Sequence, residues 1–491
     1  MRADLSRDPE RAESAAFAVV GFLIVMEFGS GLLQGWYPPL LASIGDAHDV
    51  SAAALNWVNV IFLLTSVAFV PIIAKLGDIY GHRRMLVLAA ALVAVGSLLV
   101  ALAPTFGLLL AGRVLQAPLI AFLPLEFAIV RDRDPETAGR NIAYLVGSLT
   151  AGVLAGGLAS GAMMTAVEDL TLVLLVPAVM MLVCVPTARF LVRETAARSR
   201  AKVDWLGAIL LASGLLALLS GVSNGNSLGW SHPLILALVV GGTVVLIVWV
   251  CVERRVTDPL VDFTVMARGR LVLPVVIAAL IGAQIFGSQA PTALFMRSDP
   301  NVYGFGLGVS ASLAGMLLAV NAAGAFLGSA LSDRIARASA RHHAIVLGAG
   351  LTACAYALMI VVPAGAPVFS AYLFLQGFGI GILVGLVPAV IVGRAPADSV
   401  GIASGIYNTS RTGAGSIAGA IFTLVMSSML TTVTVGGVDK TVSSLGSYHA
   451  VWATCAAICV AIAVLALFLD ADRGHRDVEN SEATARDTVG S

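Results

Sequence analysis

Charged side chains are scarce in this sequence. Asp, Glu, Lys and Arg together make up 12% of its 491 residues, whereas a soluble domain carries about a quarter. A chain with so little charge cannot cover a water-facing surface of this size, and no polar linker divides it into smaller domains. The composition therefore excludes a soluble enzyme, an intrinsically disordered protein and a small disulfide scaffold.

Lysine is rarer still, with only Lys75, Lys202 and Lys440. None of the three follows a glycine, so the chain has no G-x-x-x-x-G-K-[ST] phosphate loop and cannot hydrolyse ATP in that way. Lys and Arg balance Asp and Glu at 29 each, which gives no electrostatic case for nucleic acid. The five cysteines all fall inside apolar runs, where we expect buried, unpaired thiols. We see no cluster of metal ligands or nucleophile motif, and we expect no metal, no cofactor, no nucleotide and no catalytic site.

Apolar runs of bilayer-spanning length are what the sequence has in abundance, since about 20 residues suffice to cross the hydrocarbon core as a helix. They predict an all-α polytopic membrane protein with fourteen transmembrane helices. The expected spans are 16–40, 54–74, 84–103, 107–129, 140–162, 169–188, 205–223, 232–252, 271–291, 308–332, 343–363, 368–393, 401–427 and 449–469.

The positions of Lys and Arg predict the orientation of these spans. With a cytoplasmic N-terminus, all but four of the 29 basic residues lie on the cytoplasmic side; Arg297 and Lys440 lie outside, and Arg113 and Arg411 lie within spans. We therefore expect a multi-pass protein of an inner or plasma membrane with both termini cytoplasmic. The ends, 1–14 and 470–491, are expected to be polar tails. The outer segment 428–448 is expected to be a plain connector, with a short hairpin as the alternative.

Two halves of the chain repeat each other. Asp78 follows the second span as Asp333 follows the tenth, at an offset of 255; Gln116 matches Gln376 at an offset of 260, and Gly152 matches Gly413 at 261. These near-constant offsets predict two six-helix bundles, 15–190 and 257–469, with an inner linker and two inserted helices at 191–256. Parallel repeats with a site at their interface near the membrane midplane are a transporter architecture.

Several motifs resemble the major facilitator superfamily. Residues 74–86, AKLGDIYGHRRML, resemble its loop motif G-x-L-x-D-R-x-G-R-R/K, with His82 in place of an Arg. RVLQA at 113–117 is close to the family's R-x-x-Q-G pattern, and GVLAGG at 152–157 looks like the antiporter motif G-P-x-x-G-G. Four further stretches are similar to the fourteen-spanner drug:proton antiporter branch of that family: 204–218, 259–263, 303–318 and 401–420.

The resemblance implies the major facilitator fold, in which two six-helix bundles rock around a central site. In that family the loop motif latches the two halves together on the cytoplasmic side. Here this role would fall on Asp78, Gly81, Arg83 and Arg84, with simple turn stabilisation as the alternative. Members of the branch usually carry an Asp in the first span, and here Glu27 lies two or three residues before that place.

Charged residues inside spans are costly in lipid, so each suggests a functional hypothesis. Glu27 lies roughly 17 Å along the first span, at about 1.5 Å per residue, and we expect it to couple transport to protons; a structural pair is the alternative. We expect Arg113 to pair with Glu27 when Glu27 is ionised, or else to form a fixed structural pair. Glu126 is expected in a charge cluster near the inner face, together with Arg131 and Arg140.

Polar side chains in the repeated spans are candidates to line a cavity with apolar walls. These candidates are Gln116, Gln284, Gln289, Asn321, Tyr407, Asn408 and Arg411. Arg411 could neutralise an anionic group of a substrate or pair with an acid across the cavity. Gly152, Gly156 and Gly157 are expected to allow close helix packing, with a hinge role second.

Together these features predict a secondary transporter, driven by an electrochemical gradient, that exports amphipathic drugs or metabolites in exchange for protons. An uptake symporter or uniporter for a small nutrient is one alternative, and a membrane sensor or scaffold without flux is another. The expected partners are a small-molecule substrate, protons and membrane lipid. The oligomeric state is open, with a monomer as the expectation.

Overall fold

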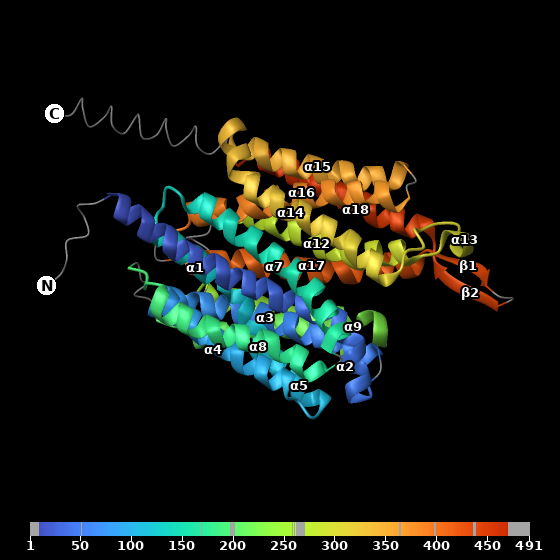
Figure 1. Ribbon diagram of the computed structural model, residues 1–491, viewed down its shortest axis with the longest axis horizontal. Coiled ribbons are helices and arrows are strands. Elements are labelled where there is room, and N and C mark those ends of the chain that lie inside the picture. Colours follow the sequence, from blue (N-terminus) through green and yellow to red (C-terminus); the bar gives the residue numbers. More distant parts are fainter. Residues whose placement is uncertain are drawn as a thin grey trace.

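The computed structural model of the chain describes residues 9–50, 52–167, 169–196, 202–257, 259, 261, 271–362, 365–396, 399–435 and 438–469. Within these ranges the chain is almost entirely helical (Figure 1). The expected tail 470–491, residues 1–8 of the other tail, and parts of the segments on either side of the inserted helices lie outside the described residues.

The first half of the chain and the two inserted helices follow one another as long helices joined by short turns. They are α1 (Pro9–Trp36), α2 (Leu41–His48), α3 (Ala52–Tyr80), α4 (His82–Ala101), α5 (Phe106–Gln116), α6 (Phe122–Arg133), α7 (Ala138–Val167), α8 (Leu170–Pro186), α9 (Trp205–Leu228) and α10 (Pro233–Glu253). Short 3-10 segments cover Pro38–Leu40 and Ala117–Ala121, and a π turn covers Thr187–Leu191. Side-chain caps fix several starts: Thr105 accepts from Leu108 N–H, and Asp169 accepts from Thr171 and Leu172 N–H.

The second half also consists mainly of long helices joined by short turns, and it contains one small sheet. It contains α12 (Val272–Arg297), α13 (Pro300–Tyr303), α14 (Ala311–Ser339), α15 (Arg341–Val361), α16 (Ala366–Arg394), α17 (Val400–Ser428), β1 (Leu430–Val435), β2 (Val438–Ser443) and α18 (Leu445–Leu467). The strands β1 and β2 pair antiparallel, with Leu430 opposite Ser443. The expectation of a plain connector at 428–448 was therefore wrong, because the Thr- and Val-rich segment suits paired strands.

Twelve helices of the described part are long and apolar enough to cross a membrane. The chain is a multi-pass membrane protein, but the count of fourteen spans is not confirmed. The long helices α1 and α17 are not among the twelve. In α17 the polar run from Tyr407 to Arg411 lowers the hydropathy of the helix.

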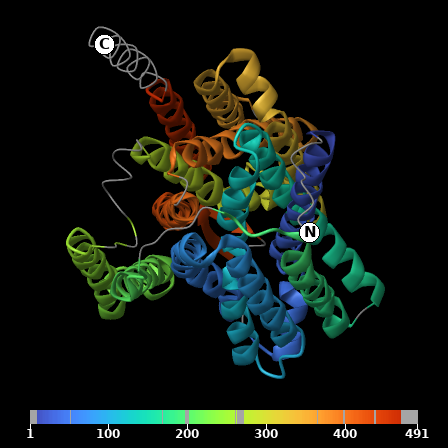
Figure 2. The ribbon, with the colours of Figure 1, turned by 90° about the vertical axis from the view of Figure 1, so that its left-hand side faces the viewer.

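Equivalent helices pack together in both halves. In the first half α1 packs against α7, and α4 packs against α5 and α8; in the second half α12 packs against α17, and α15 packs against α16 and α18. The halves meet where α7 contacts α14 and where α3 contacts α17. The inserted helices α9 and α10 pack against each other, and Figure 2 shows them as a separate pair at one side of the molecule.

The expected fourth span is broken in the middle, between α5 and α6. Pro124 has no N–H, so the carbonyl of Ile120, four residues earlier, loses its helical hydrogen-bond donor. The side-chain amide of Asn408, from α17 in the other half, donates to this carbonyl at 3.0 Å. The proline therefore creates a polar contact between the two halves in the middle of the membrane-spanning region.

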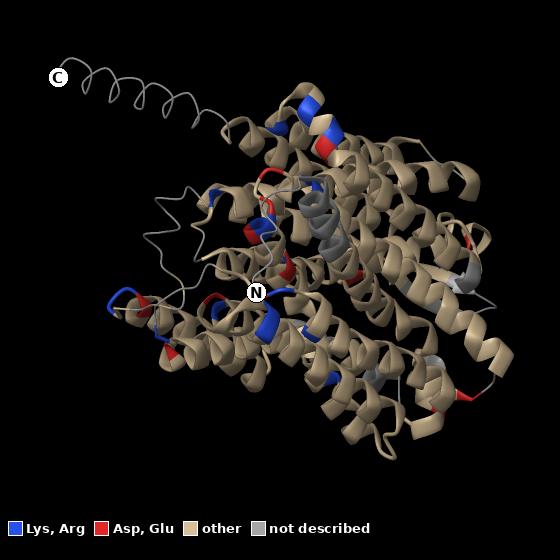
Figure 3. Cartoon of the chain, turned by 60° about the vertical axis from the view of Figure 1, so that its left-hand side comes forward, with Lys and Arg blue, Asp and Glu red and all other residues tan. Residues whose placement is uncertain are grey.

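Basic residues gather at the end of the molecule where α1 begins and α18 finishes (Figure 3). We call this the arginine-rich end and define it by Arg131, Arg140, Arg337 and Arg341. The opposite end carries β1 and β2, and we call it the hairpin end. At the arginine-rich end, the turn between α3 and α4 uses Gly81 at φ 110°, and the corresponding turn between α14 and α15 uses Ala340 at φ 83°.

Candidate functional site

Two glutamates are buried against each other between α1 and α6. Glu27 is 1% exposed and Glu126 is fully enclosed, and their carboxyl groups lie within hydrogen-bonding reach of each other. Ser30, one turn along α1 from Glu27, is a second hydrogen-bonding neighbour of Glu27. We call Glu27 and Glu126 the carboxyl pair.

The carboxyl pair requires a proton. Both oxygens of Glu126 and Oε2 of Glu27 are buried without a hydrogen-bond partner among the described residues. An ionised carboxylate only accepts hydrogen bonds, so the two groups can bond to each other only when one of them is protonated. Two ionised carboxylates in contact in a low-dielectric interior repel each other strongly. A proton shared between the two carboxyl groups therefore allows a hydrogen bond between them and also removes their charge repulsion.

This position of Glu126 corrects the expectation that it joins Arg131 and Arg140 in a charge cluster. Arg131 instead donates to the carbonyl of Ala395 at 2.5 Å, and Arg140 lines a separate pocket at the arginine-rich end. The sequence predicted a continuous helix with Glu126 near its end, whereas the structure has a 3-10 segment before α6 and places the side chain of Glu126 beside Glu27. The prolines at 118 and 124 were the signal that could have indicated this.

The expected pairing of Arg113 with Glu27 is also absent from the described structure. Arg113 is 2% exposed, and it donates to the carbonyl of Val58 at 2.8 Å and to Oε1 of Gln116 at 2.6 Å. Its guanidinium group lies over the rings of Tyr37 and Phe62, 4.1 and 4.4 Å from their centroids. Hydrogen bonds and cation–π contacts therefore stabilise this buried cation without a carboxylate.

Gln116 belongs to the same network and not to an open cavity. Its amide nitrogen donates to the hydroxyl groups of Tyr37 and Ser97, at 2.7 and 2.9 Å. Every polar group of Gln116 is therefore engaged inside the first half, which leaves none to contact a substrate.

Arg411 is a cation of the second half, in α17. Its charge acts on Glu27, and it donates to the Oδ1 atom of Asn408 at 3.1 Å. Its guanidinium group lies 5.6 and 5.9 Å from the ring centroids of Tyr407 and Phe286. The buried Nε of Arg411 has no hydrogen-bond partner among the described residues, and Arg411 is a hydrogen-bonding neighbour of the Tyr407 hydroxyl. The guanidinium group of Arg411 therefore keeps unused hydrogen-bonding capacity in a partly buried position.

The three remaining cavity candidates lie in different environments. Gln284 is fully buried, and its Oε1 accepts from the hydroxyl of Tyr356 at 2.9 Å, while its amide nitrogen has no partner in the described structure. Asn321 joins α14 to α16, because its amide donates to the carbonyl of Leu373 at 2.8 Å. Gln289 is exposed.

The loop motif joins the two halves at the arginine-rich end. The carboxylate of Asp78, 1% exposed, accepts hydrogen bonds from the backbone N–H groups of Gly401 and Ile402, both at 2.8 Å. These groups belong to the first turn of α17, where a negative charge is favoured by the helix dipole. His82, which replaces the family's usual Arg, lies 3.0 Å from both Asp78 Oδ1 and Thr195 Oγ1.

Basic residues of the motif contact the segment that leads to the inserted helices. Arg83 N–H donates to Glu194 Oε1 at 3.0 Å, and the guanidinium groups of Arg83 and Arg84 lie 3.9 and 3.8 Å from Glu194 Oε2. Gly81 has φ 110°, which L side chains rarely adopt, and a Cβ there would stand 2.5 Å from the carboxyl carbon of Glu194, so the Glu194 side chain would have to move.

The glycines of GVLAGG lie where α7 meets α1. A Cβ on Gly152 or Gly156 would collide with the backbone carbonyls of Phe28 and Leu32, respectively, whereas Gly157 has more space. The close approach therefore needs glycine at two of the three positions, and it holds the helix that carries Glu27.

A pocket of about 570 Å³ opens at the hairpin end, between α12, α17 and the strands. Aromatic side chains of Tyr303, Phe305 and Tyr448 line it together with Arg297. An aromatic and partly charged lining of this kind fits amphipathic molecules.

Comparison with known proteins decides the family. The sequence profile described as "Major Facilitator Superfamily" matches residues 23–420, which is most of the chain. The chain belongs to the Major Facilitator Superfamily. The solved structure of the human organic anion transporter MFSD10 (TETRAN) superposes with a TM-score of 0.66, covering 94% of this chain and 100% of that one at 16% identity. At this identity the likeness shows the fold alone.

Curated relatives in this superfamily are similar at low identity. The chain is 26% identical over 395 residues to the "Puromycin resistance protein pur8" of Streptomyces alboniger, covering 78% of this chain and 76% of the relative. It is 26% identical over 285 residues to the "Uncharacterized MFS-type transporter YhcA" of Bacillus subtilis, covering 56% of this chain and half of that relative's length. The chain therefore spans only about half to three quarters of the length of these relatives, and what the comparisons show of it is the superfamily and the fold.

Proposed function

We propose that this transporter exports amphipathic organic compounds in exchange for protons. The observation that carries the proposal is the carboxyl pair, Glu27 and Glu126, which is buried between α1 and α6 and needs a proton to be stable. A group that must take up and release a proton inside the membrane can use the proton gradient, which supplies about 2.3 kcal/mol per charge for each 100 mV.

The proposed transport cycle uses the two halves as rocking units. We assign the bundles to 15–190 and 257–469, with 191–256 as the insertion, and we propose that α1 and α17 also cross the membrane, giving the fourteen spans of the drug:proton antiporter branch. The matching helix pairs in the two halves support this division. The protein would act as a monomer in an inner or plasma membrane, with the arginine-rich end and both termini in the cytoplasm, as the positive-inside rule predicts.

The charge of the cargo decides whether it would move against the protons or together with them. When the carboxyl pair loses its shared proton, it becomes more negative, and a cationic or neutral hydrogen-bond-donating cargo binds better. Proton and cargo then compete for one region, which is the condition for antiport. An anionic cargo would bind better beside Arg411 when the pair is protonated, which is the condition for symport. We therefore propose a cationic or neutral amphipathic cargo, and the resistance function named for the puromycin relative supports this class.

The test is transport by purified protein in proteoliposomes with an imposed pH gradient. Ethidium and puromycin serve as cationic probes, and fluorescein serves as an anionic probe. We expect gradient-driven movement of the cationic probes against the proton flow, and loss of that movement when Glu27→Gln is introduced. Movement of a probe together with protons would favour the uptake symporter, and no movement of any probe would favour a sensor or scaffold.

A further inference from the structure

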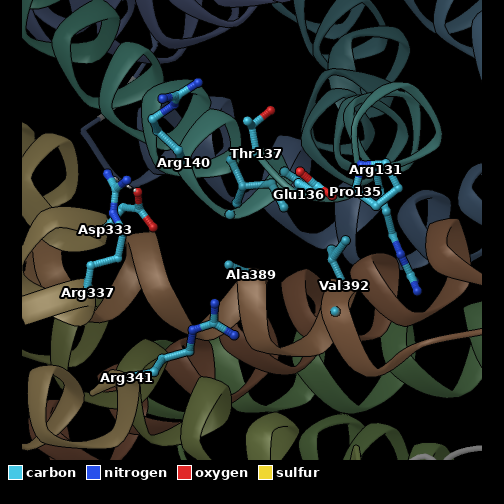
Figure 4. Close-up of a pocket in the computed structure, with 14 residues that line it drawn as sticks. Arg131, Pro135, Glu136, Thr137, Arg140, Asp333, Arg337, Arg341, Ala389 and Val392 are labelled. Atoms are coloured by element: carbon cyan, nitrogen blue, oxygen red, sulfur yellow. Dashed lines mark ion pairs between the residues drawn. The ribbon is translucent and has the colours of Figure 1, made fainter. Parts of the chain in front are cut away.

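The arginine-rich end contains a pocket that the proposed transport cycle does not use. It has a volume of about 240 Å³ and lies between the two halves (Figure 4). Four arginines from four different helices line it, and two acids accompany them: Arg131 of α6, Arg140 of α7, Arg337 of α14 and Arg341 of α15, with Glu136 and Asp333. Small residues of α7 and α16 complete the wall: Ala138, Gly139, Ala389 and Gly393.

The internal repeat explains why this pocket lies where it does. Asp333 corresponds to Asp78 at the offset of 255 residues. Asp78 joins the halves by accepting two backbone hydrogen bonds from the first turn of α17. The counterpart of that turn is the first turn of α7, and it lines the pocket. Asp333 forms its ion pair with Arg337 of its own helix instead, at 2.8 Å.

The two sides of the interface are therefore different. On the α3 and α17 side, a carboxylate joins the halves. On the α7 and α14 side, the corresponding carboxylate is neutralised within α14, and the space between the halves stays open as the pocket. We call the first contact the Asp78 lock.

The charges around the pocket favour a negatively charged ligand. Arg140 belongs to the first half, while Arg337 and Arg341 belong to the second half (Figure 4). Arg341 reaches across the interface, since its Nη2 atom lies 4.0 Å from the point where a Cβ on Gly139 would stand. Arginines from both halves therefore border one pocket, and the N-terminus of the 30-residue helix α7 adds further positive potential. Four arginines against two acids leave the lining with an excess of positive charge, which an anion would offset.

We propose that this pocket binds a phosphate-bearing anion that bridges the two halves and acts as the counterpart of the Asp78 lock. Arginines bind phosphate oxygens with paired N–H donors, and a helix N-terminus offers backbone N–H groups to the same oxygens. The phosphate can come from the headgroup of an anionic phospholipid or from a soluble phosphate compound. In either case the bound anion stabilises the state in which the halves are joined at the arginine-rich end.

The test compares two double variants of the full-length protein. Arg140→Gln with Arg341→Gln removes one arginine from each half of the pocket. Arg189→Gln with Arg255→Gln removes two exposed arginines that do not line it, and serves as the matched control. Spin labels at Tyr144→Cys and Ser339→Cys, which are both exposed positions on α7 and α14, report the separation of the halves. The background carries Ser at the exposed Cys251 and Cys354.

Each protein is placed in nanodiscs of phosphatidylcholine alone, of phosphatidylcholine with phosphatidylglycerol, or of phosphatidylcholine with added pyrophosphate. We expect an anion to increase the joined population in the wild-type and control proteins. An arginine near an anionic surface contributes a factor of about five to binding, so the pocket variant should need about 25-fold more anion for the same effect. A response to phosphatidylglycerol alone assigns the site to lipid, and a response to pyrophosphate assigns it to a soluble phosphate.

Two results would overturn the proposal. One is that neither phosphatidylglycerol nor pyrophosphate changes the distance in the wild-type protein. The other is that the pocket variant and the control variant lose the response equally, which would mean that the anion acts through general surface charge. The measurement needs no cargo and no proton gradient, so its outcome is independent of whether the transporter is a proton-coupled exporter.

Discussion

Replacing Glu126 with Gln tests the carboxyl pair most informatively, because this residue was not expected to act in proton coupling. The amide of Gln can donate a hydrogen bond to an ionised Glu27, so the variant no longer needs a shared proton. The fold should survive, because Gln has nearly the same shape and satisfies the buried oxygens that lack a donor in the wild-type structure. Proton-coupled transport should fail, because one of the two exchangeable carboxyl groups is gone.

The size of the effect follows from the contact between the two carboxyl groups. At a hydrogen-bonding separation of about 3 Å and an effective dielectric constant of about 20, two negative charges repel by roughly 5 kcal/mol. This repulsion disfavours the state in which both groups are ionised. Without it, the remaining glutamate exchanges its proton independently of the second site. We expect gradient-driven transport of ethidium to fall by at least about tenfold, which corresponds to roughly 1.4 kcal/mol.

The assay is ethidium transport in proteoliposomes with and without a pH gradient, at matched protein content. Glu253→Gln is the control, because Glu253 is also a buried glutamate, 2% exposed, but lies on the inserted helix α10 away from the pair. The control should retain coupling. The reasoning would be refuted if Glu126→Gln kept full gradient-driven transport while Glu27→Gln abolished it, because Glu27 would then act without its partner.

Three further substitutions test other parts of the structure. Asp78→Asn removes the charge that holds the first turn of α17; we expect the joined state to lose about 1 kcal/mol, seen as a longer spin-label distance at the arginine-rich end. Arg113→Lys cannot reproduce the forked and stacked contacts and should lower stability by about 2 kcal/mol, whereas Arg84→Lys, which is largely exposed, should not change the thermal midpoint. Ala340→Gly should raise the midpoint by relieving about 1 kcal/mol of strain at φ 83°, whereas Ala338→Gly in regular helix should lower it.

The sequence was sufficient to predict the class of protein, the matching packing of its two halves and the burial of Glu27. A glutamate within an apolar run is costly in lipid wherever the run packs, so its burial could be expected without coordinates. The loop motif could also be recognised from the sequence, because Asp78 and Gly81 follow a pattern of fixed spacing. The hairpin β1–β2 was considered but not favoured, since Thr and Val also occur in extended connectors.

The partner of Glu27 could not be predicted, because it depends on how one helix is broken. A continuous helix from 107 to 129 places Glu126 close to the inner face, and only the 3-10 segment Ala117–Ala121 re-aims α6. The contacts of Arg113 were missed for a related reason. The pattern of charges suggested a carboxylate, whereas Tyr37, Phe62 and two oxygen acceptors satisfy the guanidinium group.

Infrared difference spectroscopy of the purified protein in nanodiscs, with no cargo present, tests the shared proton most directly. A protonated carboxyl group in an apolar environment gives a C=O stretching band that an ionised carboxylate does not give. We predict such a band at pH 7 in the wild-type protein and in Glu253→Gln, and its loss when both Glu27→Gln and Glu126→Gln are present. A wild-type spectrum without this band, or a band that persists in the double variant, would contradict the account.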